Sequence, residues 1–121
     1  MHQQGAQAYQ QTAKTVESPR DREAALLVKA ASNIQRIRDT WPVSGQELKT
    51  TLTFNRKLWT IFMSSAVKDD LLPHTLRQNI TNLGLFILNE TREILLEPKA
   101  PEKLDALINI NRQLAAGLRG K

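Results

Sequence analysis

The chain has 121 residues, no cysteine, and 17 Lys and Arg against 12 Asp and Glu, for a formal net charge of +5. This length suits a single domain that buries roughly two-thirds of its unfolded surface, so one core can hold it without cross-links. The absence of cysteine excludes disulfides and thiolate metal sites. The polar N-terminus lacks the apolar core of a signal peptide, and the longest apolar run, Leu83 to Leu88, is far short of the roughly 20 residues of a membrane span. We therefore expect a cytoplasmic protein with one helical domain over residues 1–121.

Proline residues divide the chain into segments with helical spacing of apolar residues, and no stretch alternates long enough to predict a strand. The first segment, Ala6 to Val16, is short and weakly amphipathic and is either a helix or a frayed arm. The second begins where Ser18 serves as a cap and Pro19 occupies the first helical position, and Pro42 ends it. Its apolar stripe consists of Ala24, Leu27, Ala31, Ile34 and Trp41.

The third segment opens with a capping-box pattern, in which the Ser44 side chain bonds the Glu47 amide and the Glu47 side chain reaches back to the Ser44 amide. It carries two adjacent apolar stripes and is expected to contact two neighbouring helices. The first stripe consists of Leu48, Leu52, Trp59, Phe62 and Ala66, and the second of Phe54, Leu58 and Ile61.

The fourth segment runs from near Pro73 to about Glu97, and its middle is apolar on all sides. Such a helix is typical of the centre of a bundle. Gly84 costs about 1 kcal/mol relative to alanine inside a helix, which a close approach of a neighbouring helix would justify. Its main stripe consists of Leu76, Ile80, Leu83, Ile87 and Ile94, with Leu85, Phe86 and Leu88 on the other sides.

The fifth segment begins at Pro101 and ends at Gly120 or Gly117. Its stripe consists of Leu104, Leu107, Ile108, Leu114 and Leu118. The predicted fold is all-α, a helical bundle of four long helices plus a short N-terminal helix or arm.

Residues suited to catalysis are scarce. His74, the one histidine besides His2, stands next to Pro73 at a helix start, where a solvated or capping role is favoured. Asp69 and Asp70 are adjacent, so their side chains diverge and make a poor metal pair. There is no glycine-rich phosphate loop, zinc-protease motif or nucleophile elbow. We therefore predict no enzymatic activity, no cofactor and no metal.

Side-chain amides stand among apolar neighbours, beginning with Asn55 on the main stripe of the third segment. A buried amide without a partner costs about 1–3 kcal/mol, so these groups need partners. The favoured interpretation is a core hydrogen-bond network that fixes the register of the bundle. The other is a polar lining in a groove that receives another helix. The further amides are Gln78, Asn79, Asn82, Asn89, Asn109 and Asn111.

Three stretches carry a resemblance to a known family: residues 76–86 (LRQNITNLGLF), 54–62 (FNRKLWTIF) and 101–112 (PEKLDALININR). In order and spacing they resemble the FlaF family, flagellar biosynthesis regulators of alphaproteobacteria, and the likeness extends over nearly the whole chain. Phe54 departs from the pattern, because a tyrosine is expected before the Asn-Arg pair, and the departure removes a hydroxyl group.

The resemblance implies a role in flagellin synthesis and secretion, together with the translational regulator FlbT. It is consistent with an export chaperone that binds flagellin by helix-in-groove recognition. It brings no catalytic residues. The residues predicted to contact the partner are Asn55, Arg56, Trp59, Arg77, Gln78, Asn79, Asn82, Phe86 and Asn89.

The alternative is an RNA-binding regulator of flagellin translation, which the net charge permits. The basic residues are scattered in the sequence, and no basic run exceeds Arg56-Lys57. Most of the larger aromatic residues lie on apolar stripes, where they are expected to be core rather than platforms for bases. Direct binding of nucleic acid is therefore not expected.

Overall fold

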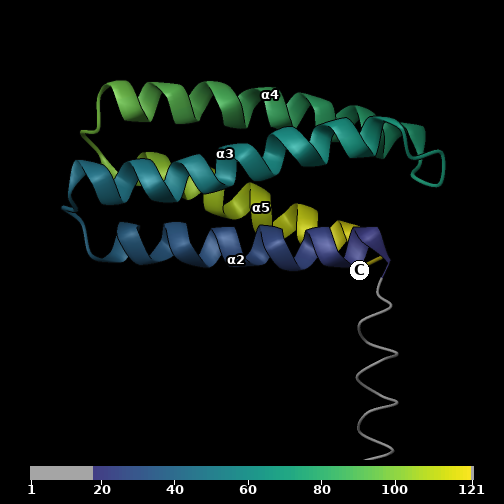
Figure 1. Ribbon diagram of the computed structural model, residues 1–121, viewed down its shortest axis with the longest axis horizontal. Coiled ribbons are helices and arrows are strands. Elements are labelled where there is room, and N and C mark those ends of the chain that lie inside the picture. The colour runs from purple at the N-terminus through teal and green to yellow at the C-terminus, as the bar shows by residue number, and fades with distance from the viewer. Residues whose placement is uncertain (1–17, 121) are drawn as a thin grey trace, which may run out of the picture.

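The computed structural model describes residues 18–120, a stretch that folds into four long helices without a strand (Figure 1). The helices are α2 (Pro19–Asp39), α3 (Gly45–Val67), α4 (His74–Leu96) and α5 (Leu104–Leu118), with a short 3-10 helix, η1 (Pro101–Lys103), before α5. The predicted bundle of four long helices is confirmed. The predicted N-terminal segment, residues 6–16, lies outside the described residues.

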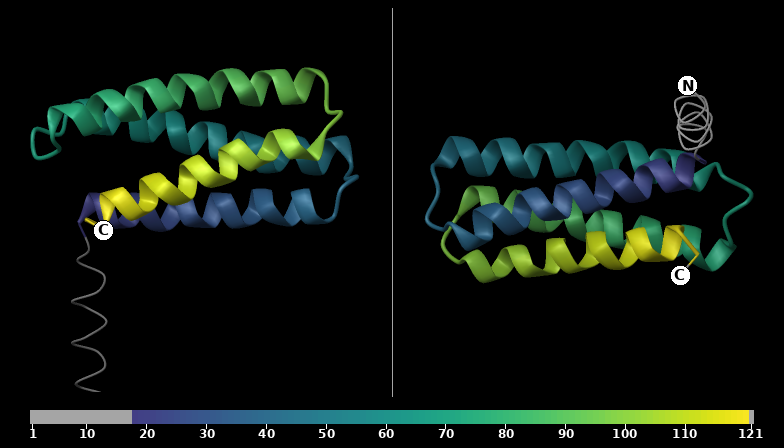
Figure 2. Two further views of the ribbon diagram at one scale, coloured as in Figure 1. Left: turned by 180° about the vertical axis from the view of Figure 1, so that it is seen from behind. Right: turned by 90° about the horizontal axis from the view of Figure 1, so that it is seen from below.

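The helices are not packed equally. α2 packs most extensively on α5, and α3 packs on both α2 and α4, which confirms that α3 contacts two neighbours. α2 and α4 lie at opposite edges of the bundle (Figures 1 and 2). The prediction of a central α4 is therefore wrong.

A single row of residues accounts for the burial of α4: Ile80, Gly84, Ile87, Thr91 and Ile94. These positions recur every three or four residues and so share one side of the helix. Leu85 and Phe86 point away from this side and are 58% and 42% exposed. The helix is apolar all round in sequence, but its neighbours cover only one side.

The second stripe of α3 differs from expectation in the same way. The first stripe is buried as predicted, and Trp59 and Phe62 make an edge-to-face contact with ring centroids 5.6 Å apart. In the second stripe, Phe54 is 38% exposed and Ile61 is 69% exposed. The contact of α3 with its second neighbour thus leaves these two side chains in solvent.

Serine caps begin α2 and α3. Ser18 Oγ accepts a hydrogen bond from the Asp21 amide at 3.1 Å, and Ser44 Oγ accepts one from the Glu47 amide at 3.0 Å. The return bond of the capping box is replaced, since the Glu47 carboxylate pairs with Arg36 Nη1 at 3.2 Å. Glu47 thereby links α3 to the last turn of α2.

The observed ends of α2 and α5 differ slightly from the predicted ones. α2 ends at Asp39, before Trp41, which lies half-buried in the loop and packs against the core; the Trp41–Pro42 peptide bond is cis. α5 ends at Leu118, and Gly120 follows with a φ of +74°. Glycine adopts this left-handed conformation without steric cost, which is typical of the residue after a helix end.

At Gly84 the close contact with α3 is made by the Met63 side chain and not by the α3 backbone. A Cβ atom added to Gly84 would lie 2.1 Å from the sulfur of Met63 and 2.6 Å from its Cγ. The Met63 side chain thus fills the space that any larger residue at position 84 would need.

We predict that Gly84→Ala lowers the free energy of unfolding by about 1–3 kcal/mol, because overpacking outweighs the better helix propensity of alanine. Gly117→Ala in α5 is the matched control, since nothing lies within 4 Å of its added Cβ. That variant should gain up to about 1 kcal/mol. Urea denaturation measures both, and equal stabilisation by the two substitutions would contradict the close contact with Met63.

Candidate functional site

A network of buried amides joins three helices in the core. Trp59 Nε1 donates to Asn111 Oδ1 at 2.9 Å, and Asn111 Nδ2 donates to Asn55 Oδ1 at 2.7 Å and to the Leu27 carbonyl at 3.3 Å. The side chains of Asn55, Trp59 and Asn111 have no exposed surface. The network confirms the core interpretation for Asn55 and Asn111, whereas Asn109 is exposed.

We predict that Asn111→Ala destabilises the fold by at least about 2 kcal/mol, because it leaves the Trp59 N–H and the Asn55 carbonyl buried without a partner. Asn109→Ala, two residues away on the solvent side, should change stability by less than about 0.5 kcal/mol. Thermal and urea unfolding compare the two. Similar effects of both substitutions would show that the network does not hold the helices.

The exposed apolar side chains gather on one half of the bundle. Of the eight large hydrophobic residues described as exposed, seven lie on α3, on α4 or in the turn between them, and only Leu26 lies on α2. The seven are Phe54, Ile61, Val67, Leu71, Leu85, Phe86 and Leu96. They do not all share one face of the two helices, but such a concentration of exposed apolar side chains on one half of the bundle makes that half the candidate interaction region.

Two hollows run along this half and meet at Lys57, which lines both. We call them together the α3–α4 groove. The first hollow lies between the helices and is lined by Arg56, Lys57, Thr60, Ile61, Leu88 and Arg92. The second continues along α3 and is lined by Gln46, Lys49, Thr50, Thr53, Phe54 and Lys57.

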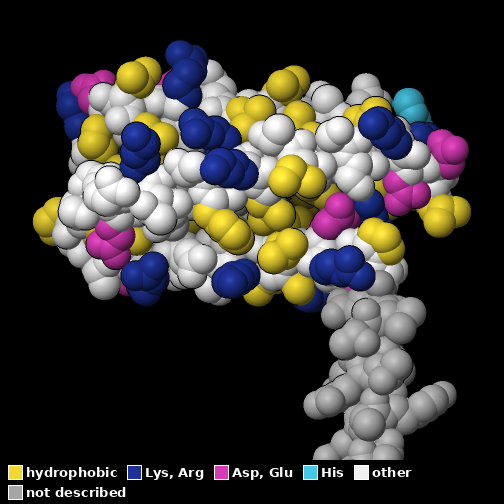
Figure 3. Space-filling model, viewed as in Figure 1, with side chains coloured by type: hydrophobic (Ala, Val, Ile, Leu, Met, Phe, Trp, Pro, Cys, Tyr) yellow, Lys and Arg dark blue, Asp and Glu magenta, His cyan; other side chains and the backbone are white. Residues whose placement is uncertain are grey.

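The α3–α4 groove is basic. Its lining holds four cationic side chains and no carboxylate, namely Lys49, Arg56, Lys57 and Arg92. Within residues 18–120 none of the four forms an ion pair. Figure 3 shows Lys and Arg side chains gathered where the first half of α3 runs beside the second half of α4, with hydrophobic side chains among them.

A third hollow lies near the turn between α3 and α4, and we call it the turn hollow. It is lined by Val67, His74, Arg77, Gln78, Thr81 and Asn82. Arg77 Nη1 lies 3.6 Å from Asp70 Oδ1, so this cation is partly neutralised. His74 is the exposed first residue of α4, in agreement with its predicted position at a helix start.

The family described as Flagellar protein FlaF matches the chain over residues 5–118. The chain belongs to the FlaF family. No curated protein and no solved structure matches it. The stretches on which the resemblance rests lie in α3, α4 and in η1 with α5, and they contain all three side chains of the buried network.

In this FlaF family member the nine residues predicted to contact a partner fall into separate places. Asn55 and Trp59 are buried in the core network and present no surface to a partner. Arg56 lines the α3–α4 groove. The turn hollow brings together Arg77, Gln78 and Asn82.

The remaining three, Asn79, Phe86 and Asn89, are exposed on α4 and line none of these hollows. Phe86 is two residues from Leu88, and a helix turns by about 200° over two residues, so the two side chains point to opposite sides. Phe86 therefore cannot share the α3–α4 groove with Leu88. Asn89 accepts from Arg92 at 2.8 Å and donates to Glu93 at 3.2 Å.

Sequence reasoning missed the basic groove of this FlaF protein. Part of its signal was present, since Lys49, Thr53, Arg56 and Thr60 follow one side of α3. The residues that α4 adds to the groove could not be predicted, because their position depends on how α4 is aligned along α3, and no local sequence pattern shows this alignment. The charges that are scattered along the chain are thus brought together by helix packing.

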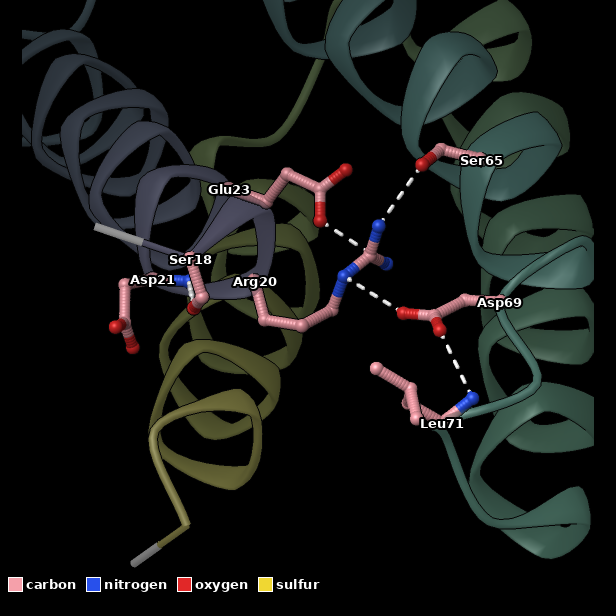
Figure 4. A network of polar contacts seen from close by, with 7 residues as sticks. All are labelled: Ser18, Arg20, Asp21, Glu23, Ser65, Asp69 and Leu71. Atoms are coloured by element: carbon pink, nitrogen blue, oxygen red, sulfur yellow. Dashed lines mark hydrogen bonds and ion pairs between the residues drawn. The ribbon is translucent and has the colours of Figure 1, made fainter. Parts of the chain in front are cut away.

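A second polar cluster joins the start of α2 to the end of α3 (Figure 4). Arg20 donates to Ser65 Oγ at 2.8 Å and forms ion pairs with Glu23 at 3.0 Å and with Asp69 at 3.3 Å. Its guanidinium also lies over the Phe62 ring, 5.9 Å from the centroid. Asp69 and Asp70 form ion pairs with different arginines, Arg20 and Arg77, as expected for adjacent side chains that diverge.

Burial raises the pKa of Glu23 above its ordinary value of 4.5, and the opposing attraction of Arg20 is the smaller effect. The pKa of Asp105 is lowered from 3.8 because it accepts a hydrogen bond from Arg38 at 2.8 Å. A raised acid pKa favours the folded state at low pH, and a lowered one favours it at higher pH. The two carboxyl groups therefore make stability depend on pH in opposite directions.

We predict that the contribution of Glu23 to stability is complete below the unfolded-state pKa and is lost as the pH rises through its folded-state pKa. Relative to Glu23→Gln, the native protein should thus lose stability as the pH rises above 4.5 and through the folded-state pKa of Glu23. Asp105→Asn should show the opposite trend, because the native contribution is lost as the pH falls through the folded-state pKa of Asp105. Urea titrations that extend from about pH 2 to about pH 8 test both, because the Glu23 change falls above pH 4.5 and the Asp105 change below pH 3.8. Parallel pH profiles would refute the assignment.

None of the helices within residues 18–120 is long and apolar enough to cross a membrane. In the same part of the chain, no group of three or more His, Asp and Glu side chains is placed to hold a metal ion.

Proposed function

We propose that this FlaF family member is a cytoplasmic assembly factor that binds flagellin monomers before export and acts without catalysis. Membership of a flagellar protein family gives the biological setting. The observation that carries the proposal is the concentration of exposed hydrophobic side chains on α3, α4 and their connecting turn. The α2–α5 half of the bundle has no comparable surface within the described residues.

The chemistry of flagellin fits such a surface. The ends of flagellin subunits are amphipathic helical segments that stay unpaired until the filament forms. Helix-in-groove recognition covers an amphipathic helix by placing its apolar anchors between two helices of the partner. Covering flagellin in this way suppresses aggregation and premature polymerisation.

The exposed anchors of this surface are not required for the fold. Ile61 is 69% exposed and Val67 is 55% exposed, so little of their area is withdrawn from water in the free protein. Interfaces draw most of their energy from a few such side chains, while polar neighbours exclude water and fix register. We assign that second role to polar residues of the turn hollow such as Gln78 and Asn82, which line it together with Val67.

We predict that purified flagellin monomer binds the protein in a calorimetric titration and that flagellin lacking both terminal segments does not. Ile61→Ser should weaken binding at least about tenfold while stability changes by less than about 0.5 kcal/mol. Leu26→Ser, an exposed leucine on α2, is the matched control and should leave affinity unchanged. Asn82→Ala tests the turn hollow in the same assay.

Retained affinity for flagellin without its ends would sink the helix-in-groove proposal. Tight, salt-sensitive binding to flagellin messenger RNA, with no binding to flagellin, would favour the RNA-binding alternative, because phosphate contacts weaken steeply with salt. Action together with FlbT, which the family resemblance implies, stays a prediction that a titration with purified FlbT checks.

A further inference from the structure

We propose that the α3–α4 groove binds an acidic amphipathic helix, one whose apolar stripe is flanked by carboxylates. This inference deepens the proposed function and rests on it only in taking the helix to be a segment of flagellin. The argument uses the shape of the groove, its apolar residues and its charge.

The groove has the length of a helical ligand. Its lining runs along α3 from Gln46 to Ile61, which corresponds to about 22 Å at the helical rise per residue. An α-helix of about 15 residues spans that distance. Together the two hollows match about four turns of a partner helix, which would lie between α3 and α4 beside Arg56 to Ile61 and continue along α3 alone towards Gln46.

Apolar side chains recur along the groove at helical intervals. Phe54 and Ile61 are seven residues apart, which is about two turns, so both lie on the same side of α3. Leu88 lines the groove from α4 and is half-buried. An apolar stripe with positions about two turns apart on the partner can meet these side chains in register.

The positive charge of the groove lining determines which kind of partner helix can bind. Some arginines elsewhere in the bundle, such as Arg20, Arg36 and Arg38, have carboxylate partners, and the groove differs in holding four cations and no carboxylate in one lining. The four cations of the groove have none within residues 18–120, although Arg92 donates to the neutral amide of Asn89. A partner with carboxylates beside its apolar stripe neutralises them, whereas a basic helix is repelled.

A second copy of the chain is a poor occupant of the groove. In a two-fold contact the same surface patch of both copies meets, which would place the basic lining of one copy against that of the other. Single-stranded RNA is also a poor fit, because it requires aromatic platforms for its bases, and Phe54 is the one aromatic residue in the lining.

The test uses two synthetic helical peptides of about 18 residues with the same leucine stripe, one flanked by glutamate and the other by lysine. We expect the acidic peptide to bind the full chain and the basic peptide not to bind. Raising the salt from about 50 to 300 mM should weaken the acidic complex, because exposed ion pairs are screened. Equal affinity for both peptides would overturn the inference.

The variant Lys57→Glu/Arg92→Glu should bind the acidic peptide at least about tenfold more weakly, the expected order for reversing two rim charges. It should gain affinity for the basic peptide, a result that a misfolded variant cannot give. Lys29→Glu/Arg112→Glu is the matched control, since both residues are exposed and form no ion pair within residues 18–120. Equal loss in the control pair would refute a specific site.

Flagellin titrations with the same variants separate this inference from the proposed function. If flagellin binds the native protein and the groove variant equally, the groove assignment fails and the proposed function stands. If flagellin does not bind but the acidic peptide does, with the charge preference above, the groove assignment stands and flagellin is the wrong partner. An RNA 20-mer that displaces the acidic peptide at lower concentration than the peptide itself would also overturn the inference.

Discussion

The fold depends on one asparagine in the middle of α5. Asn111 accepts from the indole of Trp59 and donates to Asn55 on α3 and to a carbonyl of α2. These bonds have fixed directions, whereas apolar packing alone tolerates sliding of one helix along another. Because an unpaired polar group in the core is costly, the network penalises any register that separates Asn111 from Trp59 and Asn55. It therefore fixes how α5 lies against α2 and α3.

Contacts extend from this network to the end of the bundle. Trp59 meets Phe62 edge to face, and the Arg20 guanidinium lies over Phe62. Arg20 in turn reaches Ser65 and Asp69, next to the turn that leads into α4. The face of α3 that points into the bundle is thus occupied along much of its length. The opposite face, with Phe54, Ile61 and the basic residues, has no structural task in the described part of the chain and is available for a partner.

The sequence predicted where the helices lie along the chain but not where α4 lies in the bundle. Caps, prolines and apolar spacing are local signals, and they located the four long helices and most of the core, including Trp59 and the stripe of α5. The all-round apolar middle of α4 predicted a central helix, because periodicity cannot tell a face covered by a neighbour from one kept for a partner. Leu85 and Phe86 look the same as Ile87 in sequence, yet only Ile87 is buried. The same limit explains why Asn55 and Trp59 were expected at a binding surface although they hold the core.

The mixture of charged and apolar residues in the groove affects how quickly a partner can bind and be released. Under the proposed function the protein has to capture flagellin quickly and release it at export, so very tight apolar burial would be a disadvantage. Rim charges accelerate encounter, and each exposed ion pair adds at most about 1 kcal/mol, so the four cations select an acidic partner without making the complex very tight. A few half-exposed anchors such as Phe54 and Leu88 can then supply moderate affinity while only a small apolar area is buried at the interface. We expect the basic lining also to disfavour pairing of two copies through the groove itself. Under the proposed function, unpaired cations beside apolar residues on α3 and α4 thus favour fast capture together with moderate affinity.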